Sequence, residues 1–252
     1  MSQQPLADPL AAPIRLEGSG RAGVVLLHGW TGSPAHLRML ADALHDRGHS
    51  IVAPLLAGHG TAVGDMLGTS WRDWLRSAAE GAQEVVDSGK TLHLVGLSMG
   101  GILSLLLAPV FGAASVTTIS APMKVYDRFA PHSWLVRGST RLRPHEPVAL
   151  AGDGVDRFRV QYDHSPVGTV ADLFDLIRAA RATLGRVTCP ALVIQSRADQ
   201  TVRPESASIL RDGLSGTRAR VVWLERAGHV ALLDEERSVI HREVAAHIAS
   251  AS

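Results

Sequence analysis

The sequence predicts an α/β protein whose mainly parallel sheet carries helices on both faces. Short apolar runs rich in Val, Ile and Leu alternate with helix-like segments along most of the 252 residues. These runs are apolar throughout instead of alternating with polar residues, as expected of parallel strands that are buried on both faces. Sheets of this kind place their chemistry at the carboxyl ends of the strands. The loops that follow the apolar runs are therefore where we expect a functional site.

The first half of the chain predicts regular pairs of a strand and a helix. We expect strands at residues 24–28, 50–53, 92–95 and 115–119, and helices at residues 33–48, 70–89 and 99–111. Ser33 as N-cap and Pro34 at the first helical position are typical of a helix start, and Gly48 is typical of a helix end. The second helix has one apolar face at helical spacing. That face consists of Trp71, Trp74, Leu75, Ala78, Ala82, Val85 and Val86.

Residues 122–186 break this rhythm. They are rich in Arg, Pro and Gly and show a helical pattern only near residues 170–184. Because this stretch is too long for an ordinary connection, we expect an inserted cap, or lid, between two core strands. The core is expected to comprise residues 1–121 and 187–252. Its second part predicts strands at residues 191–195 and 220–224 and helices at residues 204–214 and 234–249.

Composition excludes several classes of partner. The formal net charge is +1, from 25 basic and 24 acidic residues, which is too small for an obligatory nucleic-acid partner. No apolar window is long enough to span a bilayer, and residues 1–13 carry no secretory signal pattern. The one cysteine, Cys189, excludes an internal disulfide and suits a reducing compartment. We therefore expect a cytoplasmic protein, whose oligomeric state the sequence does not define.

No cofactor is expected. The twelve histidines are scattered and show no H-E-x-x-H or Cys/His spacing, so we expect no metal site. The glycines form neither G-x-G-x-x-G nor a phosphate-binding P-loop, so we expect no nucleotide.

The segment from Gly96 to Gly100, Gly-Leu-Ser-Met-Gly, directly follows an expected strand and opens an expected helix. This is the pattern of a nucleophile elbow, in which a serine occupies a strained turn and the flanking glycines relieve crowding. The helix adds the positive end of its dipole beneath the developing negative charge. The alternative is an ordinary glycine turn with a helix-capping serine. The strand before it and the helix after it favour Ser98 as a nucleophile.

A serine hydroxyl needs a base to take its proton, and the base needs an acid to orient it. In this kind of fold the acid precedes the base, and both follow the nucleophile in the chain. His229 follows the strand expected at residues 220–224, and Asp199 follows the strand expected at residues 191–195. A solvated loop histidine and a turn aspartate are the alternatives. The order Ser98, Asp199, His229 favours a catalytic triad.

A tetrahedral oxyanion needs preorganised N–H donors. The residue after the nucleophile supplies one of them, the backbone N–H of Met99. The loop after the first core strand supplies the other, the backbone N–H of Trp30. The Trp30 side chain can also line the pocket, because the two roles do not compete.

These segments together resemble the small capped α/β-hydrolases that include bacterial carboxylesterases and monoacylglycerol lipases. The matching segments are His28-Gly29-Trp30-Thr31-Gly32, Pro54 with Gly58-His59-Gly60, residues 71–74, Gly96 to Gly101, Ser196 to Asp199, and Gly228-His229-Val230. They follow the family's order across residues 24–234. The resemblance implies an α/β-hydrolase fold with about seven strands and a small cap. One extra strand then fits near residues 13–17, and His59 is interpreted as a brace for a loop near the site.

The resemblance also implies a serine carboxylesterase that hydrolyses short- to medium-chain acyl esters or monoacylglycerols. Two alternatives stay open. Another Ser-dependent hydrolase, splitting a C–C bond or an amide, would keep the same triad. A catalytically silent binding protein on this fold would not need all three groups. A dehalogenase is disfavoured, because that chemistry requires a carboxylate at position 98.

The expected cap is rich in cations, namely Arg128, Arg137, Arg141, Arg143, Arg157 and Arg159, with His132 and His145. A solvated basic face is the favoured interpretation. The sharper hypothesis is that one of these arginines binds a carboxylate on the substrate, as in a half-ester of a dicarboxylic acid. The apolar residues Phe129, Trp134, Leu135 and Val136 are enough to wall an acyl pocket.

Overall fold

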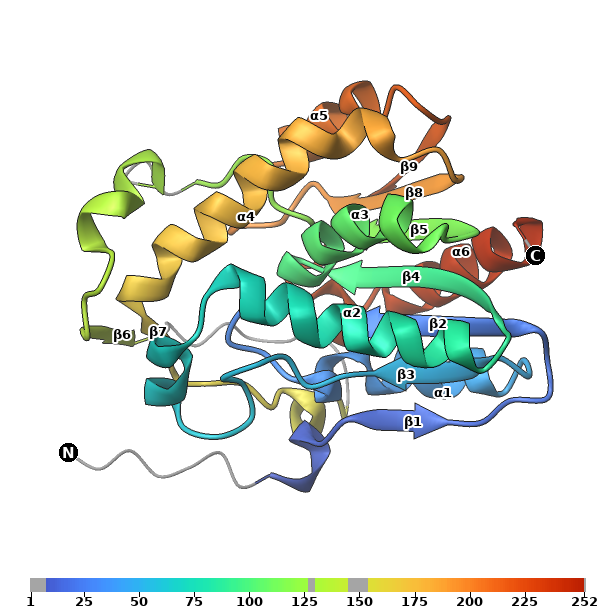
Figure 1. Ribbon diagram of the computed structural model, residues 1–252, viewed down its shortest axis with the longest axis horizontal. Coiled ribbons are helices and arrows are strands. Elements are labelled where there is room, and N and C mark those ends of the chain that lie inside the picture. Colours follow the sequence, from blue (N-terminus) through green and yellow to red (C-terminus); the bar gives the residue numbers. More distant parts are fainter. Residues whose placement is uncertain (1–7, 127–129, 145–153, 252) are drawn as a thin grey trace.

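A seven-stranded sheet forms the centre of the molecule in a computed structural model that describes residues 8–126, 130–144 and 154–251 (Figure 1). The strand order is β1-β3-β2-β4-β5-β8-β9. The strands are β1 (Ile14–Leu16), β2 (Ala22–Leu27), β3 (Ser50–Ala53), β4 (Thr91–Leu97), β5 (Ser115–Ile119), β8 (Ala191–Ser196) and β9 (Ala219–Leu224). All neighbours pair in parallel except β1 with β3. The predicted α/β fold is confirmed, including the extra strand at the start of the chain.

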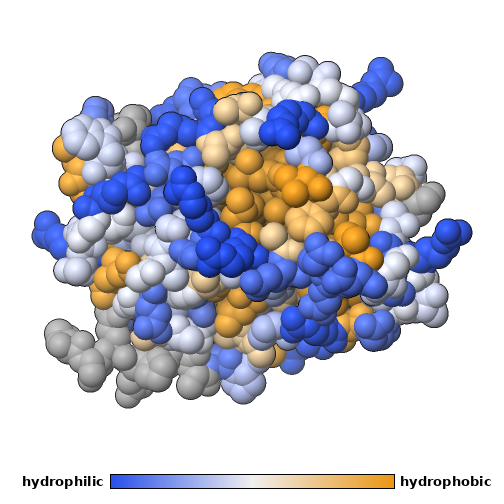
Figure 2. Space-filling model, viewed as in Figure 1, coloured by the Kyte–Doolittle hydropathy of each residue, from blue (hydrophilic) through white to orange (hydrophobic). Residues whose placement is uncertain are grey.

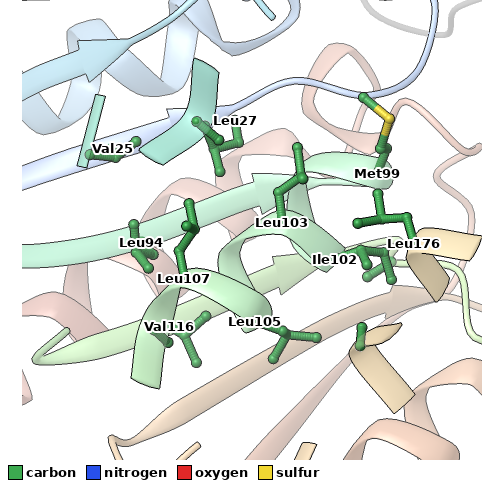
Figure 3. Close-up of a cluster of buried hydrophobic side chains, with 14 of the residues drawn as sticks. Val25, Leu27, Leu94, Met99, Ile102, Leu103, Leu105, Leu107, Val116 and Leu176 are labelled. Carbon is green, nitrogen blue, oxygen red and sulfur yellow. The ribbon is translucent and has the colours of Figure 1, made fainter. Parts of the chain in front are cut away.

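Helices cover both faces of the sheet. The helices are α1 (Arg38–His45), α2 (Trp71–Asp87), α3 (Met99–Phe111), α4 (Val170–Thr183), α5 (Glu205–Gly213) and α6 (Arg237–Ser250). Side chains from α2 to α5 share one buried cluster with Val25 and Leu27 of β2. Figure 3 shows the side chains of α3 and Leu176 of α4 in this cluster. Side chains from α1 and α6 share the other cluster with Val24 and Leu26. Successive residues of a strand point to opposite faces, so a strand of continuous apolar residues supplies both cores.

Helix α3 packs very closely against the strands beside it. A Cβ atom on Gly96 would lie 2.1 Å from the carbonyl carbon of Gly100, and one on Gly100 would lie 2.0 Å from the carbonyl oxygen of Leu27. The glycines therefore let the helix start directly above the sheet. The helix is apolar on all sides, and Figure 2 shows apolar side chains gathered between α2 and α3, ringed by hydrophilic residues. Val110 of α3 is 70% exposed.

Two local predictions were wrong. The segment after Ser33 is a 3₁₀ turn, Pro34–Leu37, followed by α1. Ser33 does not cap it, because its Oγ donates to the carbonyl of Val160 at 2.6 Å, a partner that local sequence does not show. On α2, Val86 is 39% exposed, whereas Val85 fills the buried position. Adjacent helical residues point about 100° apart, so only one of the two can face the core.

The range expected to form the cap contains a small separate hairpin. Strand β6 (Leu142–Pro144) pairs antiparallel with β7 (His164–Pro166), apart from the main sheet (Figure 1). Helix α4 follows, and its buried Leu176 and Ile177 join the core cluster around α3. Within the described residues, no helix is long and apolar enough to cross a membrane.

Candidate active site

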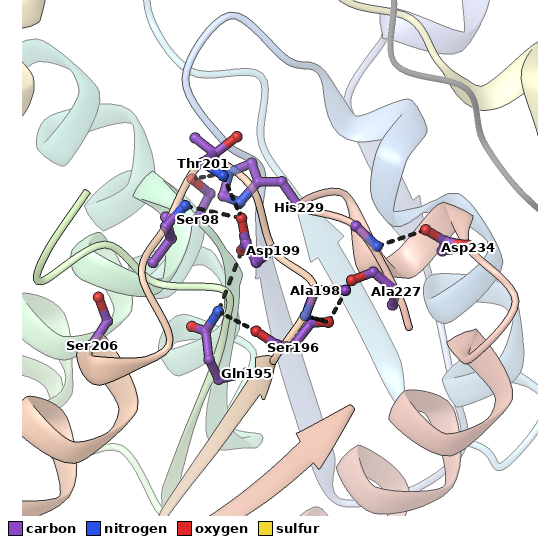
Figure 4. A network of polar contacts seen from close by, with 12 residues as sticks. Ser98, Gln195, Ser196, Ala198, Asp199, Thr201, Ser206, Ala227, His229 and Asp234 are labelled. Carbon is purple, nitrogen blue, oxygen red and sulfur yellow. Dashed lines mark hydrogen bonds and ion pairs between the residues drawn. The ribbon is translucent and has the colours of Figure 1, made fainter. Parts of the chain in front are cut away.

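Ser98 lies between the end of β4 and the first residue of α3, as the elbow pattern predicts. Its backbone has φ 54° and ψ −118°, a conformation that non-glycine residues rarely adopt. Such strain persists only where the surrounding structure imposes it, and it is found mostly at functional sites. The turn directs the Oγ of Ser98 toward His229, and the distance from Oγ to Nε2 is 3.0 Å (Figure 4).

The side chains of His229 and Asp199 complete a hydrogen-bonded row with Ser98. His229 Nδ1 lies 2.9 Å from Asp199 Oδ2. The other carboxylate oxygen of Asp199 accepts the backbone N–H groups of Thr201 at 2.8 Å and Val202 at 2.9 Å. An ionised carboxylate only accepts, so Nδ1 carries the proton and Nε2 accepts from the Ser98 hydroxyl. The three residues named from sequence order are thus adjacent, at the carboxyl ends of β4, β8 and β9.

Asp199 is 1% exposed, and burial alone would raise the pKa of its carboxyl group. His229 and the N–H groups of Val202 and Thr201 outweigh burial, so the pKa of Asp199 is lowered from its ordinary value. The carboxylate therefore stays ionised at neutral pH.

The two expected oxyanion donors belong to the residue after Ser98 and to the loop that follows β2. Met99 is the first residue of α3, and the first N–H groups of a helix have no partner within the helix. The Gly29 carbonyl accepts from His28 Nδ1 at 2.9 Å and from the Gly32 N–H at 3.1 Å. In a trans peptide the N–H points away from the carbonyl, so these contacts fix the direction of the Trp30 N–H. A Cβ atom on Gly29 would lie 3.3 Å from the Cβ atom of Ser98.

Two buried histidines hold this loop. His28 Nε2 accepts the N–H of Leu56 at 3.1 Å, and His59 Nε2 accepts the N–H of Thr31 at 3.2 Å. Each ring is therefore neutral with its proton on Nδ1, which donates to a backbone carbonyl. Burial lowers the pKa of His28 well below 6.5 and that of His59 to about 4. The rings meet edge to face, with centroids 4.9 Å apart. The interpretation of His59 as a brace agrees with these contacts.

Residues from the expected cap hold the other side of the same loop. The N–H of Tyr162 donates to the carbonyl of Thr31 at 2.9 Å. Its hydroxyl donates to the carbonyl of Gly58, also at 2.9 Å. The indole N–H of Trp30 donates to Oγ1 of Thr169 at 3.0 Å. Sequence reasoning missed both Tyr162 and Thr169, because neither lies in a recognisable motif.

The cap arginines divide into different environments. Arg137 pairs with Asp175 at 2.6 Å, and Arg157 lies over the ring of Phe158. Arg141 and Arg143 line a cavity of about 330 Å³ with Val136 and Leu142, among others. Arg159 acts on the buried ring of His36, whose pKa is lowered to about 4 by burial first and by the charge of Arg159 second. The hypothesis that a cap arginine binds a carboxylate on the substrate remains a prediction for the cap arginines other than Arg137, which is paired with Asp175.

Other side chains expected to line the site differ in position. Trp134 and Leu135 are 61% and 64% exposed, so neither side chain is enclosed by the described residues. His132 is also exposed. Arg128, Phe129 and His145 lie outside the described residues. In the part of the chain that the structure describes, no three His, Cys, Asp or Glu side chains are grouped so that they could hold a metal ion.

Comparison with known proteins places this chain in a family. The model of the alpha/beta hydrolase family matches residues 24–242. The thermostable monoacylglycerol lipase of Bacillus sp. (strain H-257) is 32% identical over 250 residues, 95% of each chain. The carboxylesterase of Bacillus subtilis (strain 168) is 28% identical over 233 residues, 92% of this chain and 94% of that one. The chain belongs to the alpha/beta hydrolase family, and its resemblance to carboxylesterases and monoacylglycerol lipases is confirmed.

A solved structure agrees with these relatives. It comes from work on LipS and LipT, two metagenome-derived lipolytic enzymes, and has a TM-score of 0.88 to this chain with 31% sequence identity. The alignment covers 96% of this chain and 98% of the other. The similarity therefore extends over the expected cap as well as the core.

Proposed function

We propose that this protein is a serine carboxylesterase that hydrolyses short- to medium-chain acyl esters or monoacylglycerols. The observation that carries the proposal is the row from Ser98 Oγ through His229 to Asp199, with both joining distances at 3.0 Å or less. A serine paired with a base that is itself oriented by a buried acid is the arrangement that activates a hydroxyl for acyl transfer. The names of the relatives support esters as the substrate class.

The first half-reaction forms an acyl-enzyme. His229 Nε2 takes the proton of Ser98 as Oγ attacks the ester carbonyl carbon, and Asp199 stabilises the resulting imidazolium. The carbonyl oxygen becomes an oxyanion that accepts hydrogen bonds from the N–H groups of Trp30 and Met99. As the C–O bond of the ester breaks, His229 gives its proton to the leaving alkoxide. The alcohol departs and Ser98 carries the acyl group.

The second half-reaction repeats these steps with water. His229 takes a proton from a water molecule as the water oxygen attacks the acyl carbon. The oxyanion forms at the same two N–H groups and then collapses, breaking the bond to Ser98. His229 returns the proton to Oγ, and the carboxylic acid leaves. The side chains present supply every proton transfer in this sequence.

Residues 122–186 serve in this proposal as a cap over a core made of residues 1–121 and 187–252. The separate β6–β7 hairpin supports that assignment, as do the contacts of Tyr162 and Thr169 with residues 28–32, which we call the oxyanion loop. A cap in this position contributes to the shape of the acyl site and so to chain-length preference.

The test is hydrolysis of p-nitrophenyl esters from acetate to palmitate, together with monoacylglycerols, by the wild type and Ser98→Ala. We expect turnover to peak at short or medium chains and kcat to fall by at least about 10⁴-fold in the variant. Turnover that survives in Ser98→Ala would remove the triad assignment. A wild type inactive on every ester but active on an amide or a cleavable C–C bond would change the substrate class while keeping the triad.

A further inference from the structure

The loop that leads to His229 is held by a carboxylate from the start of α6. We call residues 225–228 the base loop, because they connect β9 to His229. The carboxylate of Glu236 accepts three backbone N–H groups in succession, those of Glu225 at 3.1 Å, Arg226 at 2.7 Å and Ala227 at 2.8 Å. Burial would raise the pKa of Glu236, but these N–H groups outweigh it and lower that pKa.

A second carboxylate takes the fourth N–H of the base loop. Asp234 Oδ2 accepts the N–H of Gly228 at 2.7 Å, and Oδ1 accepts the N–H of Glu235 at 2.8 Å (Figure 4). Asp234 is 6% exposed, so water replaces it poorly. Gly228 directly precedes His229 in the chain. Every backbone N–H of the base loop thus points to one of these two carboxylates.

The base loop is also joined to the residues around Asp199. The hydroxyl of Ser196 donates to the carbonyl of Ala227 and accepts the N–H of Ala198 at 3.1 Å. Gln195 Nε2 lies 3.3 Å from Asp199 Oδ2, the oxygen that faces His229. A continuous set of hydrogen bonds therefore connects the two carboxylates, the base loop and the acid.

We propose that Asp234 is a positioning residue for His229, acting through the base loop together with Glu236. This inference rests on the proposed function, in which His229 exchanges protons with Ser98. Proton transfer requires Nε2 to stay within hydrogen-bond reach of Oγ, and small displacements of a catalytic group reduce the rate steeply. Without fixed acceptors for its N–H groups the base loop would move, and the imidazole of His229 would lose its alignment with Ser98 and Asp199.

The chemistry of Asp234 makes the proposal sharply testable. Both of its oxygens accept an N–H, so the site requires two acceptors from one side chain. Asparagine has the same shape but offers only one acceptor oxygen, and its NH₂ would face an N–H, donor against donor. Asp234→Asn therefore removes one contact without changing the volume of the side chain. Glu235 in the same turn is exposed and pairs with Arg226 at 2.9 Å, so Glu235→Gln is a matched control.

As a single substitution in the otherwise unchanged protein, we expect Asp234→Asn to lower kcat by about 10- to 100-fold while KM changes by less than about twofold. Glu235→Gln should leave both constants within about twofold of the wild type. Should Asp234→Asn fail to fold, Glu236→Gln tests the same loop. That variant keeps one acceptor oxygen, and we expect a kcat loss of about 3- to 10-fold. Wild-type kcat in a folded Asp234→Asn would overturn the proposal.

A double-mutant cycle separates positioning from general damage to the fold. Because Asp234 acts through His229, Asp234→Asn should not lower the residual turnover of His229→Ala on an activated p-nitrophenyl ester. An equal loss in both backgrounds would show that Asp234 serves stability alone and would refute the proposal. Failure of the proposed function gives a different result, a wild type that hydrolyses no ester at all.

Discussion

The N–H of Thr31 donates to Nε2 of His59 across 3.2 Å, and this contact holds a residue whose φ is 62°. Threonine is β-branched and rarely adopts positive φ, so the loop needs an external partner to keep this shape. Thr31 follows Trp30 directly, and the proposed oxyanion donor is the N–H of Trp30. His59 lies 28 residues after Thr31 in the chain, and its buried imidazole therefore helps to fix the geometry of the proposed oxyanion site.

Replacing His59 tests this connection. His59→Leu leaves the Thr31 N–H buried without an acceptor, which we expect to cost about 1–3 kcal/mol of stability. We also expect kcat to fall by about 10-fold and the affinity for a trifluoromethyl ketone, which binds as an oxyanion, to fall in parallel. His59→Gln retains an acceptor oxygen and should retain more of both. Unchanged affinity for the ketone in His59→Leu would separate His59 from the oxyanion site.

The buried neutral histidines predict lability in acid. His36, His59, His93 and His241 each have a pKa lowered to about 4, with burial the main cause. A lowered folded-state pKa means that protonation favours the unfolded chain, whose histidines have a pKa near 6.5. Their contribution to stability is complete above pH 6.5 and is lost as the pH falls toward 4. For His59, which is fully buried, it amounts to about 3 kcal/mol.

Urea unfolding at half-unit steps between pH 7.5 and 4.5 measures this loss, and we expect the free energy of unfolding to fall steadily below pH 6.5. His59→Gln should be less stable at neutral pH but should show a shallower slope, because one titrating group is gone. A variant whose slope equals that of the wild type would show that His59 does not contribute to the acid lability.

The contact of α3 with the sheet predicts that Gly100 cannot be replaced. A methyl group there would lie 2.0 Å from the carbonyl oxygen of Leu27, which is backbone and cannot rotate away. We expect Gly100→Ala to destabilise the protein by more than about 4 kcal/mol or to prevent folding. Gly64→Ala is the control, since nothing lies within 4 Å of a Cβ atom at that position. Thermal unfolding of the two variants decides, and equal Tm values would contradict the expected clash.

The backbone of Ser98 predicts a conflict between stability and activity. Its φ of 54° with ψ of −118° is comfortable only for glycine. Both Ser98→Gly and Ser98→Ala remove the nucleophile, but only glycine relieves the strain. We expect Ser98→Gly to be more stable than Ser98→Ala by about 1 kcal/mol, measured by urea unfolding at pH 7.5. A Ser98→Ala variant of equal or greater stability would mean that the turn carries no such strain.

Sequence reasoning reached the site because strand ends converge in this fold. Ser98, Asp199 and His229 each follow an apolar run, and parallel strands bring those positions to one edge of the sheet. The choice of the Trp30 and Met99 N–H groups as oxyanion donors rests on the same logic and stays a prediction. A pattern of strands and helices, with the order of the functional residues, was enough to predict which side chains meet.

The supporting contacts could not be predicted in the same way. Ser33 has the side chain of a helix cap, but its partner is Val160, 127 residues away. Asp234 and Glu236 resemble ordinary acidic residues at a helix start. Their partners are the N–H groups of the base loop, and backbone groups leave no mark on the sequence. Long-range hydrogen bonds to backbone atoms are therefore the part of a site that becomes known only from the structure.

The attachment of Tyr162 and Thr169 to the proposed oxyanion loop has a consequence for engineering. A chimera that received residues 122–186 from a relative would exchange the residue that donates its N–H to Thr31 and the hydroxyl partner of Trp30 together with the proposed cap. Specificity and turnover would then change in the same step. Transplants that keep both residues should tolerate foreign loops between them, whereas those that discard them need compensating changes in the recipient scaffold.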